Sequence, residues 1–241
     1  HQSGRRQRQM CIRDRIPARW SSSRLPGKPL KKIGSKPMIQ WVYESCRKSD
    51  ADFIFIATDS EKIRDQVLEF NGQVIMTSVD HKTGTDRIHE AITKIKCHQE
   101  DLIINVQGDE PFISHDDINT LIHNYNDDFE MATLYKELKK EDIDDTNTVK
   151  ISVTDNIATS FSRNFKSSDS IYHHLGIYAY RCEFLKKFVN YDQSENEIRE
   201  SLEQLRALDN GHQIKAFKSS STSSFGIDTE EDLIRANETI K

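Results

Sequence analysis

The sequence has no long hydrophobic run, few cysteines and no excess of positive charge. No stretch approaches the ~20 apolar residues that a membrane-spanning helix requires. The four cysteines, Cys11, Cys46, Cys97 and Cys182, lie far apart and form no C-x-x-C pair. This spacing argues against a zinc site or a disulfide scaffold, and it predicts a protein of the reducing cytoplasm. The net charge of −5 argues against non-specific nucleic-acid binding as the main role.

What the sequence does contain is a loop that concentrates cations and prolines. Residues 16–30 hold three of the five prolines, whose rings fix φ, and Gly27, which lets the backbone approach a ligand closely. The same loop carries Arg19, Arg24 and Lys28 beside a run of serines. Such a loop suits a polyphosphate, although its spacing differs from the Walker pattern. From these residues alone, a phosphate site and a solvated basic loop are equally good interpretations.

The chain after residue 35 alternates predicted helices and strands. Short continuous apolar runs predict buried strands at 53–57, 74–76 and 102–106. Apolar residues at helical spacing predict a helix capped by Ser35 and further helices at 60–71, 85–97 and 115–125. The alternation predicts an α/β fold with a mostly parallel central sheet and helices on both faces.

The second half of the chain has more strands and fewer helices. Strands are predicted near 130–135, 149–154, 158–162 and 173–180. They indicate a smaller mixed-sheet extension or subdomain. The closing elements are predicted as a helix at 195–210, a strand at 214–218 and a helix at 229–240.

Polar residues follow several of these strands, where open α/β sheets bind ligands. Thr58 and Asp59 follow one strand, and Asp109 follows another within the segment Gln107–Pro111. Hard oxygen ligands of this kind suit Mg²⁺ together with phosphates. Alternatively, Asp109 or Glu110 only caps the next helix, and Asp228, taken singly, is more simply explained as part of a helix cap.

Three other segments offer polar side chains with an ordinary alternative for each. Arg87 follows a glycine turn and is either a ligand-binding cation or a surface arginine. His174 and Tyr178 share one face of a predicted strand, where a histidine is more often structural than catalytic. Glu203 and Gln204 lie on a predicted helix and would usually face solvent.

Together these segments resemble the 3-deoxy-manno-octulosonate cytidylyltransferase family, the CMP-Kdo synthetases of Gram-negative bacteria. The resemblance covers nearly the whole chain from Ile16 onward, in family order. RLPGKPL alone would indicate only the wider sugar nucleotidyltransferase class, whereas the full set is more specific. The matching segments are IPAR…SSRLPGKPL (16–30), KPMIQWVYE (36–44), IATD (56–59), TGTDRI (83–88), NVQGDEP (105–111), FSR (161–163), HHLGIYAYR (173–181), LEQLRAL (202–208) and GIDTEEDL (226–233).

The resemblance implies a Rossmann-like nucleotidyltransferase fold and a role for each matching residue. The implied catalytic residues are Lys28, Arg19 and Asp109, and the implied Mg²⁺ ligands are Asp109 and Asp228, which favours a site role for Asp228 over a plain cap. The nucleotide site would comprise Arg19, Arg24, Lys28, Thr58, Asp59 and Gln107. The sugar-acid site would comprise Arg87, Gln107, His174, Tyr178, Glu203 and Gln204.

The reaction implied is CTP plus 3-deoxy-manno-octulosonate (Kdo) giving CMP-Kdo and pyrophosphate, for lipopolysaccharide biosynthesis. The resemblance further implies Mg²⁺ as cofactor, a cytoplasmic homodimer, and no nucleic-acid or membrane partner. Two alternatives stay open. The substrate could be a related sugar acid, such as 8-amino-Kdo or a sialic-type acid, or the chain could be an inactive nucleotide-binding homologue.

The N-terminus departs from the family pattern. Residues 1–14 carry four arginines without an apolar core, and they are not a signal peptide. A transit peptide is possible, but we favour a non-native or disordered segment before a single domain at 15–241. Because Arg13, Asp14 and Arg15 interrupt the apolar run that a buried strand needs, no proper central strand is expected there, and an apolar replacement of 9–15 should raise the melting temperature and lower the KM for CTP.

A second departure lies after the FSR segment. Residues 164–169 lack the Ile-Pro-aromatic pattern expected near the family's dimer contact. The details of the dimer are therefore left open.

Overall fold

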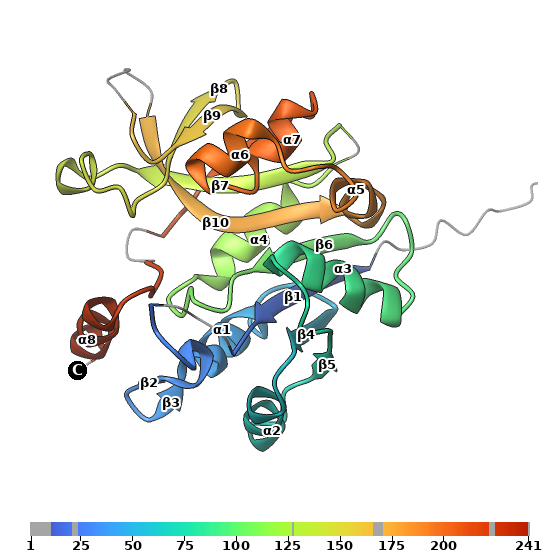
Figure 1. The fold of residues 1–241 in the computed structure, drawn as a ribbon, viewed down its shortest axis with the longest axis vertical. Coiled ribbons are helices and arrows are strands. Elements are labelled where there is room, and N and C mark those ends of the chain that lie inside the picture. The colour runs from blue at the N-terminus through green and yellow to red at the C-terminus, as the bar shows by residue number, and fades with distance from the viewer. Residues whose placement is uncertain (1–10, 21–23, 127, 166–170, 222–224, 241) are drawn as a thin grey trace, which may run out of the picture.

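A nine-stranded sheet runs through the computed structural model of this chain (Figure 1). The structure describes residues 11–20, 24–126, 128–165, 171–221 and 225–240. The strand order is β5-β4-β1-β6-β10-β7-β11-β9-β8. The strands are β1 (Ile12–Ala18), β4 (Phe53–Thr58), β5 (Val74–Met76), β6 (Leu102–Val106), β7 (Met131–Glu137), β8 (Lys150–Thr154), β9 (Ile157–Ser162), β10 (Ile171–Arg181) and β11 (Ile214–Lys218).

The two halves of the sheet differ as the sequence predicts. The first four strands in space, β5, β4, β1 and β6, are parallel. The later strands form the mixed part, because β10 is antiparallel to both β6 and β7, while β11 is parallel to β7. The mixed part continues the same sheet, so it is an extension and not a separate subdomain.

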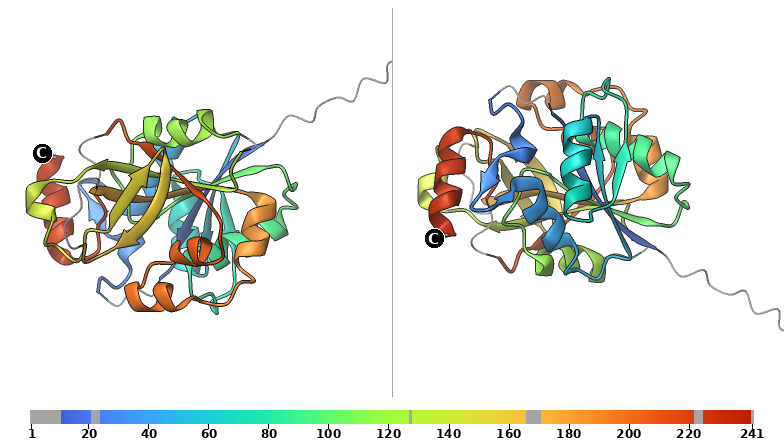
Figure 2. Two further views of the ribbon diagram at one scale, coloured as in Figure 1. Left: turned by 90° about the horizontal axis from the view of Figure 1, so that it is seen from above. Right: turned by 90° about the horizontal axis from the view of Figure 1, so that it is seen from below.

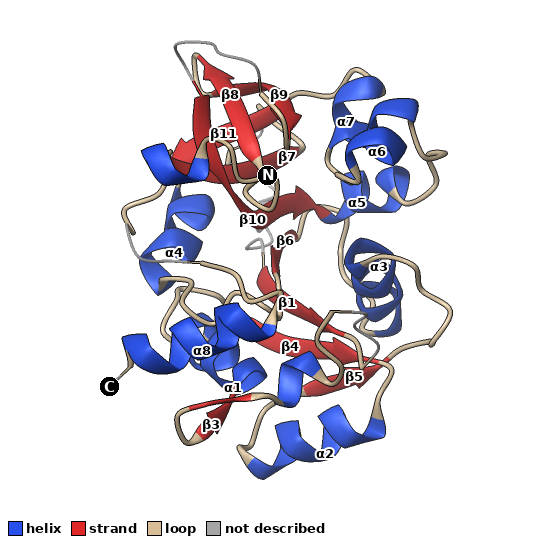
Figure 3. Cartoon of the chain, turned by 60° about the vertical axis from the view of Figure 1, so that its left-hand side comes forward, coloured by secondary structure: helices blue, strands red, loops and turns tan. Residues whose placement is uncertain are grey.

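Helices cover both faces of the sheet (Figure 3). Neighbouring strand residues show the division, since Ile104 packs into one core cluster and Ile103 into the other. On the first face lie α1 (Met38–Cys46), α2 (Glu61–Glu69) and α4 (His115–His123). On the second face lie α3 (Gly84–Lys94), α5 (Cys182–Phe188) and α7 (Leu205–Asp209). No helix in the described ranges is long and apolar enough to cross a bilayer.

A third, smaller core cluster sits beneath the cationic loop. It joins Leu25 and Ile33 to Ile227, to buried residues of α8 (Glu230–Thr239) and to Met38 of α1. The short hairpin of β2 (Lys32–Ile33) and β3 (Lys36–Pro37) lies against α8, and Gly34 N donates to Asn237 Oδ1 at 2.8 Å (Figure 2). Segments from the two ends of the chain therefore share one core.

Two of the helix predictions are wrong in detail, and one helix was not predicted. The helix predicted at 195–210 is two helices, α6 (Glu195–Glu200) and α7, because Ser201 takes a left-handed conformation with φ 54°. Ser35 does not cap α1, whose N-cap is Pro37 without a side-chain hydrogen bond. The sequence interpretation also missed α5, which follows β10 directly. Among the described residues, 3₁₀ turns form at Lys28–Leu30 and Lys140–Asp142.

The prediction that residues 1–14 form no central strand is wrong at its C-terminal end. β1 begins at Ile12 and pairs in parallel with both β4 and β6. Its cations find partners, because Arg13 bonds to Asp101 at 2.9 Å and the Arg15 guanidinium lies 4.7 Å from the ring centre of Phe55. Flat guanidinium groups can stack on aromatic rings even when buried. Residues 1–10 lie outside the described part of the chain.

Asp14 of this charged strand makes the stability of the fold depend on pH. Its side chain is fully buried, and burial raises its pKa from 3.8 to about 7 although Ser49 Oγ donates to Oδ2. A raised carboxyl pKa gives a contribution to stability that is complete below the unfolded value and is lost as the pH rises through the folded value. Asp14 therefore makes the fold less stable at pH 8 than at pH 4.

We expect Asp14→Asn to flatten the fall in unfolding free energy between about pH 4 and about pH 8. Urea denaturation across this range measures the effect. The exposed Asp65→Asn on α2 is the matched control and should keep the slope of the parent protein. Equal slopes for Asp14→Asn and the parent protein would contradict the assignment.

Candidate active site at the carboxyl ends of the strands

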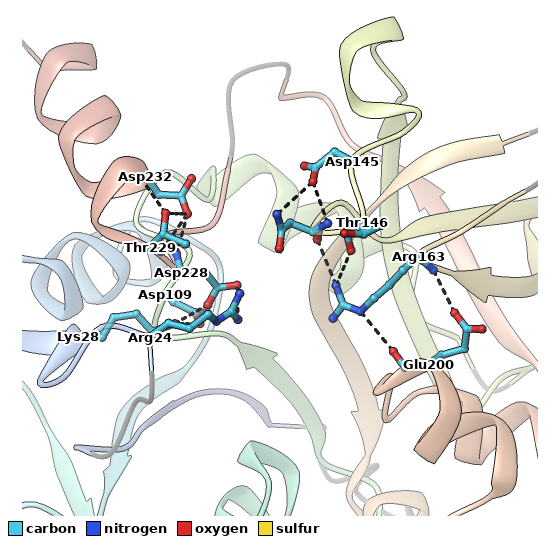
Figure 4. A network of polar contacts seen from close by, with 11 residues as sticks. Arg24, Lys28, Asp109, Asp145, Thr146, Arg163, Glu200, Asp228, Thr229 and Asp232 are labelled. Atoms are coloured by element: carbon cyan, nitrogen blue, oxygen red, sulfur yellow. Dashed lines mark hydrogen bonds and ion pairs between the residues drawn. The ribbon is translucent and has the colours of Figure 1, made fainter.

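Lys28 joins two carboxylates from distant parts of the chain (Figure 4). Its Nζ lies 2.6 Å from Asp109 Oδ2 and 2.9 Å from Asp228 Oδ1. Arg24 reaches the other oxygen of Asp228, with Nη2 3.0 Å from Oδ2. The Lys28 side chain is only 13% exposed, whereas those of Asp109 and Asp228 are 34% and 46% exposed. Both carboxylates thus face one partly open site.

Neither carboxylate caps a helix, so the alternative explanation from the sequence is wrong for both. α4 is capped by Ser114, whose hydroxyl accepts from Asp116 N at 3.1 Å. α8 is capped by Thr229 in a capping box with Asp232. Asp228 stands one residue before that cap, which leaves its side chain free to meet Lys28.

Lys28 and Asp228 hold each other in the ionised state. Burial by itself lowers the pKa of Lys28, but the carboxylates of Asp109 and Asp228 outweigh it and raise the pKa above its ordinary value. Burial by itself raises the pKa of Asp228, but Lys28 and Arg24 lower it below the ordinary value. In contrast, burial raises the pKa of Glu110 to about 8, with the charge of Asp109 adding to the effect.

The other nucleotide-site predictions lie at the ends of β1 and β4. Arg19 is exposed just after β1. Thr58 is buried, and its Oγ1 accepts from Ser60 N at 3.2 Å. Asp59 Oδ2 accepts from Arg87 Nη2 at 2.7 Å.

Arg87 is held by protein acceptors rather than exposed as a surface arginine. Its side chain is 3% exposed, and Nη1 also donates to Thr77 Oγ1 and Ser78 O. Its role in sugar binding stays a prediction, since the side chain is nearly fully buried and already makes three hydrogen bonds to the protein.

The remaining predicted sugar-site residues come from several elements. His174 and Tyr178 lie in β10, Gln107 follows β6, and Glu203 contacts α3. His174 Nε2 lies 3.0 Å from Thr133 Oγ1, its ring centre lies 5.5 Å from that of Tyr178, and burial lowers its pKa to about 3. Gln107 Nε2 donates to Asn105 Oδ1 at 3.2 Å. Glu203 Oε2 accepts from Thr85 Oγ1 at 2.6 Å.

Several polar atoms near this region are buried without a hydrogen-bond partner in the described structure. They are Glu203 Oε1, Gln204 Nε2 and Asn105 Nδ2. Buried polar groups in native proteins are nearly always paired, so these three atoms are candidates for bonding a polar ligand, although Glu203 Oε1 also lies 3.7 Å from Arg206 Nη2 in an ion pair. Sequence reasoning missed Asn105 and Thr85, although an asparagine inside the otherwise apolar β6 run was a visible signal.

Comparison with known proteins identifies the family of this site. A family model described as cytidylyltransferase matches residues 15–214. The 3-deoxy-manno-octulosonate cytidylyltransferase of Fusobacterium nucleatum is 44% identical over 228 residues, which cover 90% of this chain and 92% of that protein. The protein of the same name from Photobacterium profundum is 42% identical over 234 residues, covering 90% and 94%.

The chain belongs to the 3-deoxy-manno-octulosonate cytidylyltransferase family. It is therefore a nucleotidyltransferase. A solved structure of a CMP:2-keto-3-deoxy-manno-octonic acid synthetase complexed with CTP matches 95% of this chain and 98% of that one, with a TM-score of 0.88 and 38% identity. A glucose-1-phosphate thymidylyltransferase of Bacillus anthracis has a TM-score of 0.72 at 18% identity and shares the fold alone. The predicted Rossmann-like nucleotidyltransferase fold is confirmed.

In this cytidylyltransferase family member, Glu203 and Gln204 lie in the turn between α6 and α7 rather than on a solvated helix. A buried ion pair fixes the turn, since Arg206 bonds both oxygens of Glu197 at 2.8 and 2.5 Å. Arg163 of the FSR segment belongs to a separate network, in which it donates to the carbonyls of Glu200 and Thr146 (Figure 4). Most of the following segment, residues 166–170, lies outside the described part.

Proposed function

We propose that this chain transfers CMP from CTP to Kdo, giving CMP-Kdo and pyrophosphate. The observation that carries the proposal is the convergence of Lys28, Asp109 and Asp228, and buried polar atoms of Asn105, Glu203 and Gln204 without a hydrogen-bond partner add to it. The first group suits a metal-bound triphosphate, and the second suits a polyhydroxylated acid. The names of the relatives supply both substrates.

The cationic loop would hold the triphosphate. Arg19, Arg24 and Lys28 can neutralise phosphate oxygens and stabilise the leaving pyrophosphate. Thr58, Asp59 and Gln107 stand at the neighbouring strand ends, where the nucleoside would lie. To contact the phosphates, the Lys28 ammonium would give up its bonds to Asp109 and Asp228.

Asp109 and Asp228 fit Mg²⁺. The stand-in for the metal is the Lys28 ammonium, which already meets one oxygen of each carboxylate at hydrogen-bond distance. Within the described residues no group of three or more His, Cys, Asp or Glu side chains forms a complete metal centre. This agrees with the preference of Mg²⁺ for few carboxylates plus water and substrate phosphates. When bound, Mg²⁺ would neutralise developing charge and orient the phosphates.

The sugar-side residues would orient the acceptor. The anomeric hydroxyl of Kdo attacks the α-phosphorus in line, so that an O–P bond forms as the bond to the β-phosphate oxygen breaks and pyrophosphate leaves. Gln107, His174, Tyr178, Glu203 and Gln204 can bind the hydroxyl groups, with Arg87 as the candidate for the carboxylate. No covalent intermediate with the protein is needed. On the family resemblance seen in the sequence, we also propose a cytoplasmic homodimer serving lipopolysaccharide synthesis.

Pyrophosphate release from CTP tests this function. We expect release with Kdo and Mg²⁺, and none after chelation. A panel with 8-amino-Kdo and a sialic acid tests the substrate alternatives, since a related acid that outperforms Kdo would reassign the acceptor. CTP binding without pyrophosphate from any acid would show an inactive nucleotide-binding homologue.

A further inference from the structure

Two short segments run side by side behind the carboxylate pair. Ile227 N donates to Asp109 O at 2.9 Å. One step further, a Cβ on Gly226 would lie 3.0 Å from Glu110 Oε1, so the backbone fits closely against that side chain. At the far end, the rings of Phe112 and Phe225 are 4.9 Å apart between centres.

These contacts join residues in antiparallel order. Residue 109 meets 227, residue 110 meets 226, and residue 112 meets 225. Because the order is antiparallel, Asp109 at the start of one segment and Asp228 at the end of the other lie at the same end. The ring pair lies at the opposite end, away from the Lys28 site.

The Phe225 ring is supported on its other side by a cation. The Arg235 guanidinium lies 4.1 Å from the centre of the Phe225 ring, whereas Trp41 stands further off, with its ring centre 6.4 Å from that of Phe112. Arg235 also pairs with Asp232 of the α8 capping box at 3.3 Å. Offset or tilted aromatic pairs and cation–π contacts both restrict how rings can move. Phe225 is thus tied to the helix that follows Asp228.

We propose that Phe112 and Phe225 form a clamp that sets the spacing between the Asp109 and Asp228 carboxylates. They are positioning residues, since the rings act through the two backbones and touch no substrate. The proposal rests on the proposed function, because it concerns the two carboxylates assigned to the metal. With the clamp loosened, the two carboxylates would sample a range of separations, and a divalent cation would meet both less often.

Binding of Mn²⁺ to the free protein, followed by the electron paramagnetic resonance of unbound Mn²⁺, tests the clamp. We expect Phe112→Leu and Phe225→Leu each to weaken Mn²⁺ binding by roughly 10- to 100-fold, as supporting residues around metal sites typically do. Phe225→Tyr keeps the ring and should retain the parent affinity. The kinetic counterpart is a raised Mg²⁺ requirement for half-maximal activity.

Trp41→Leu is the matched control. Trp41 belongs to the same aromatic group but lies on α1, outside both segments. Its loss should lower the melting temperature while the Mn²⁺ affinity is kept. If Phe225→Leu also lowers only the melting temperature, the ring pair is ordinary core and the clamp is refuted. If neither the parent protein nor Lys28→Met, which empties the place between the two carboxylates, binds Mn²⁺, the metal assignment fails together with the clamp, whereas pyrophosphate release still decides the reaction.

Discussion

Asp109→Asn is expected to lower kcat by about a thousandfold while the fold survives. The substitution removes one of the two carboxylates that we propose as metal ligands but keeps the size of the side chain and one acceptor oxygen. It also leaves Lys28 with Asp228 as its remaining carboxylate partner among those described. Steady-state pyrophosphate release measures the rate, and circular dichroism with a thermal melt checks the fold.

Asp116→Asn provides the matched control for this change. Asp116 is an exposed acid in the first turn of α4, a few residues further along the same segment. It should leave kcat unchanged. If the two variants have similar rates, Asp109 is not a metal ligand and the assignment of the site is wrong.

Lys28→Met is expected to lower the catalytic efficiency with CTP and to raise the affinity for a divalent metal ion. The loss of a buried ammonium should lower kcat/KM for CTP by about a hundredfold or more, because charge-assisted contacts to phosphate disappear. In the absence of CTP, Mn²⁺ should bind more tightly than to the parent protein. The reason is that Lys28 Nζ occupies the place between Asp109 and Asp228 that a metal ion would take.

Arg24→Met separates this displacement from a general change of charge. Arg24 meets only Asp228 of the pair and is 55% exposed, so solvent already screens it. Its removal should tighten Mn²⁺ binding much less than Lys28→Met does. Equal gains from both variants would mean that net charge alone governs metal affinity, and weaker Mn²⁺ binding by Lys28→Met would contradict displacement outright.

The strongly patterned parts of the fold were predictable from the sequence. β4 and β6 are short apolar runs, and β11 matches its predicted range. The charged β1 strand was not predictable. The rule that buried strands are apolar takes no account of residues elsewhere in the chain that pair with buried charged side chains. Arg13 finds Asp101 88 positions away, and Arg15 lies over Phe55 of the neighbouring strand. Such pairings exist only after the sheet has formed.

The candidate site shows the same limit. The sequence placed Asp109 correctly at a strand end, but it left helix capping open for both acids, and only the hydroxyls of Ser114 and Thr229 decide that question. It placed Glu203 and Gln204 on a continuous helix, because LEQLRAL has helical composition. The break depends on the left-handed Ser201 and on the Glu197–Arg206 pair, which turn both side chains inward.

The separation of Lys28 and Asp228 along the chain has a consequence for the order of folding. The two residues meet although they are 200 positions apart in the chain. β11, the last strand of the described sheet, ends at Lys218, so a chain can contain every one of these strands before Asp228 has been synthesised. The sheet can then form before Asp228 joins Asp109 at Lys28. Asp228 reaches this position only when α8 docks. Nucleotide affinity during refolding would report that late docking, whereas circular dichroism would report the sheet.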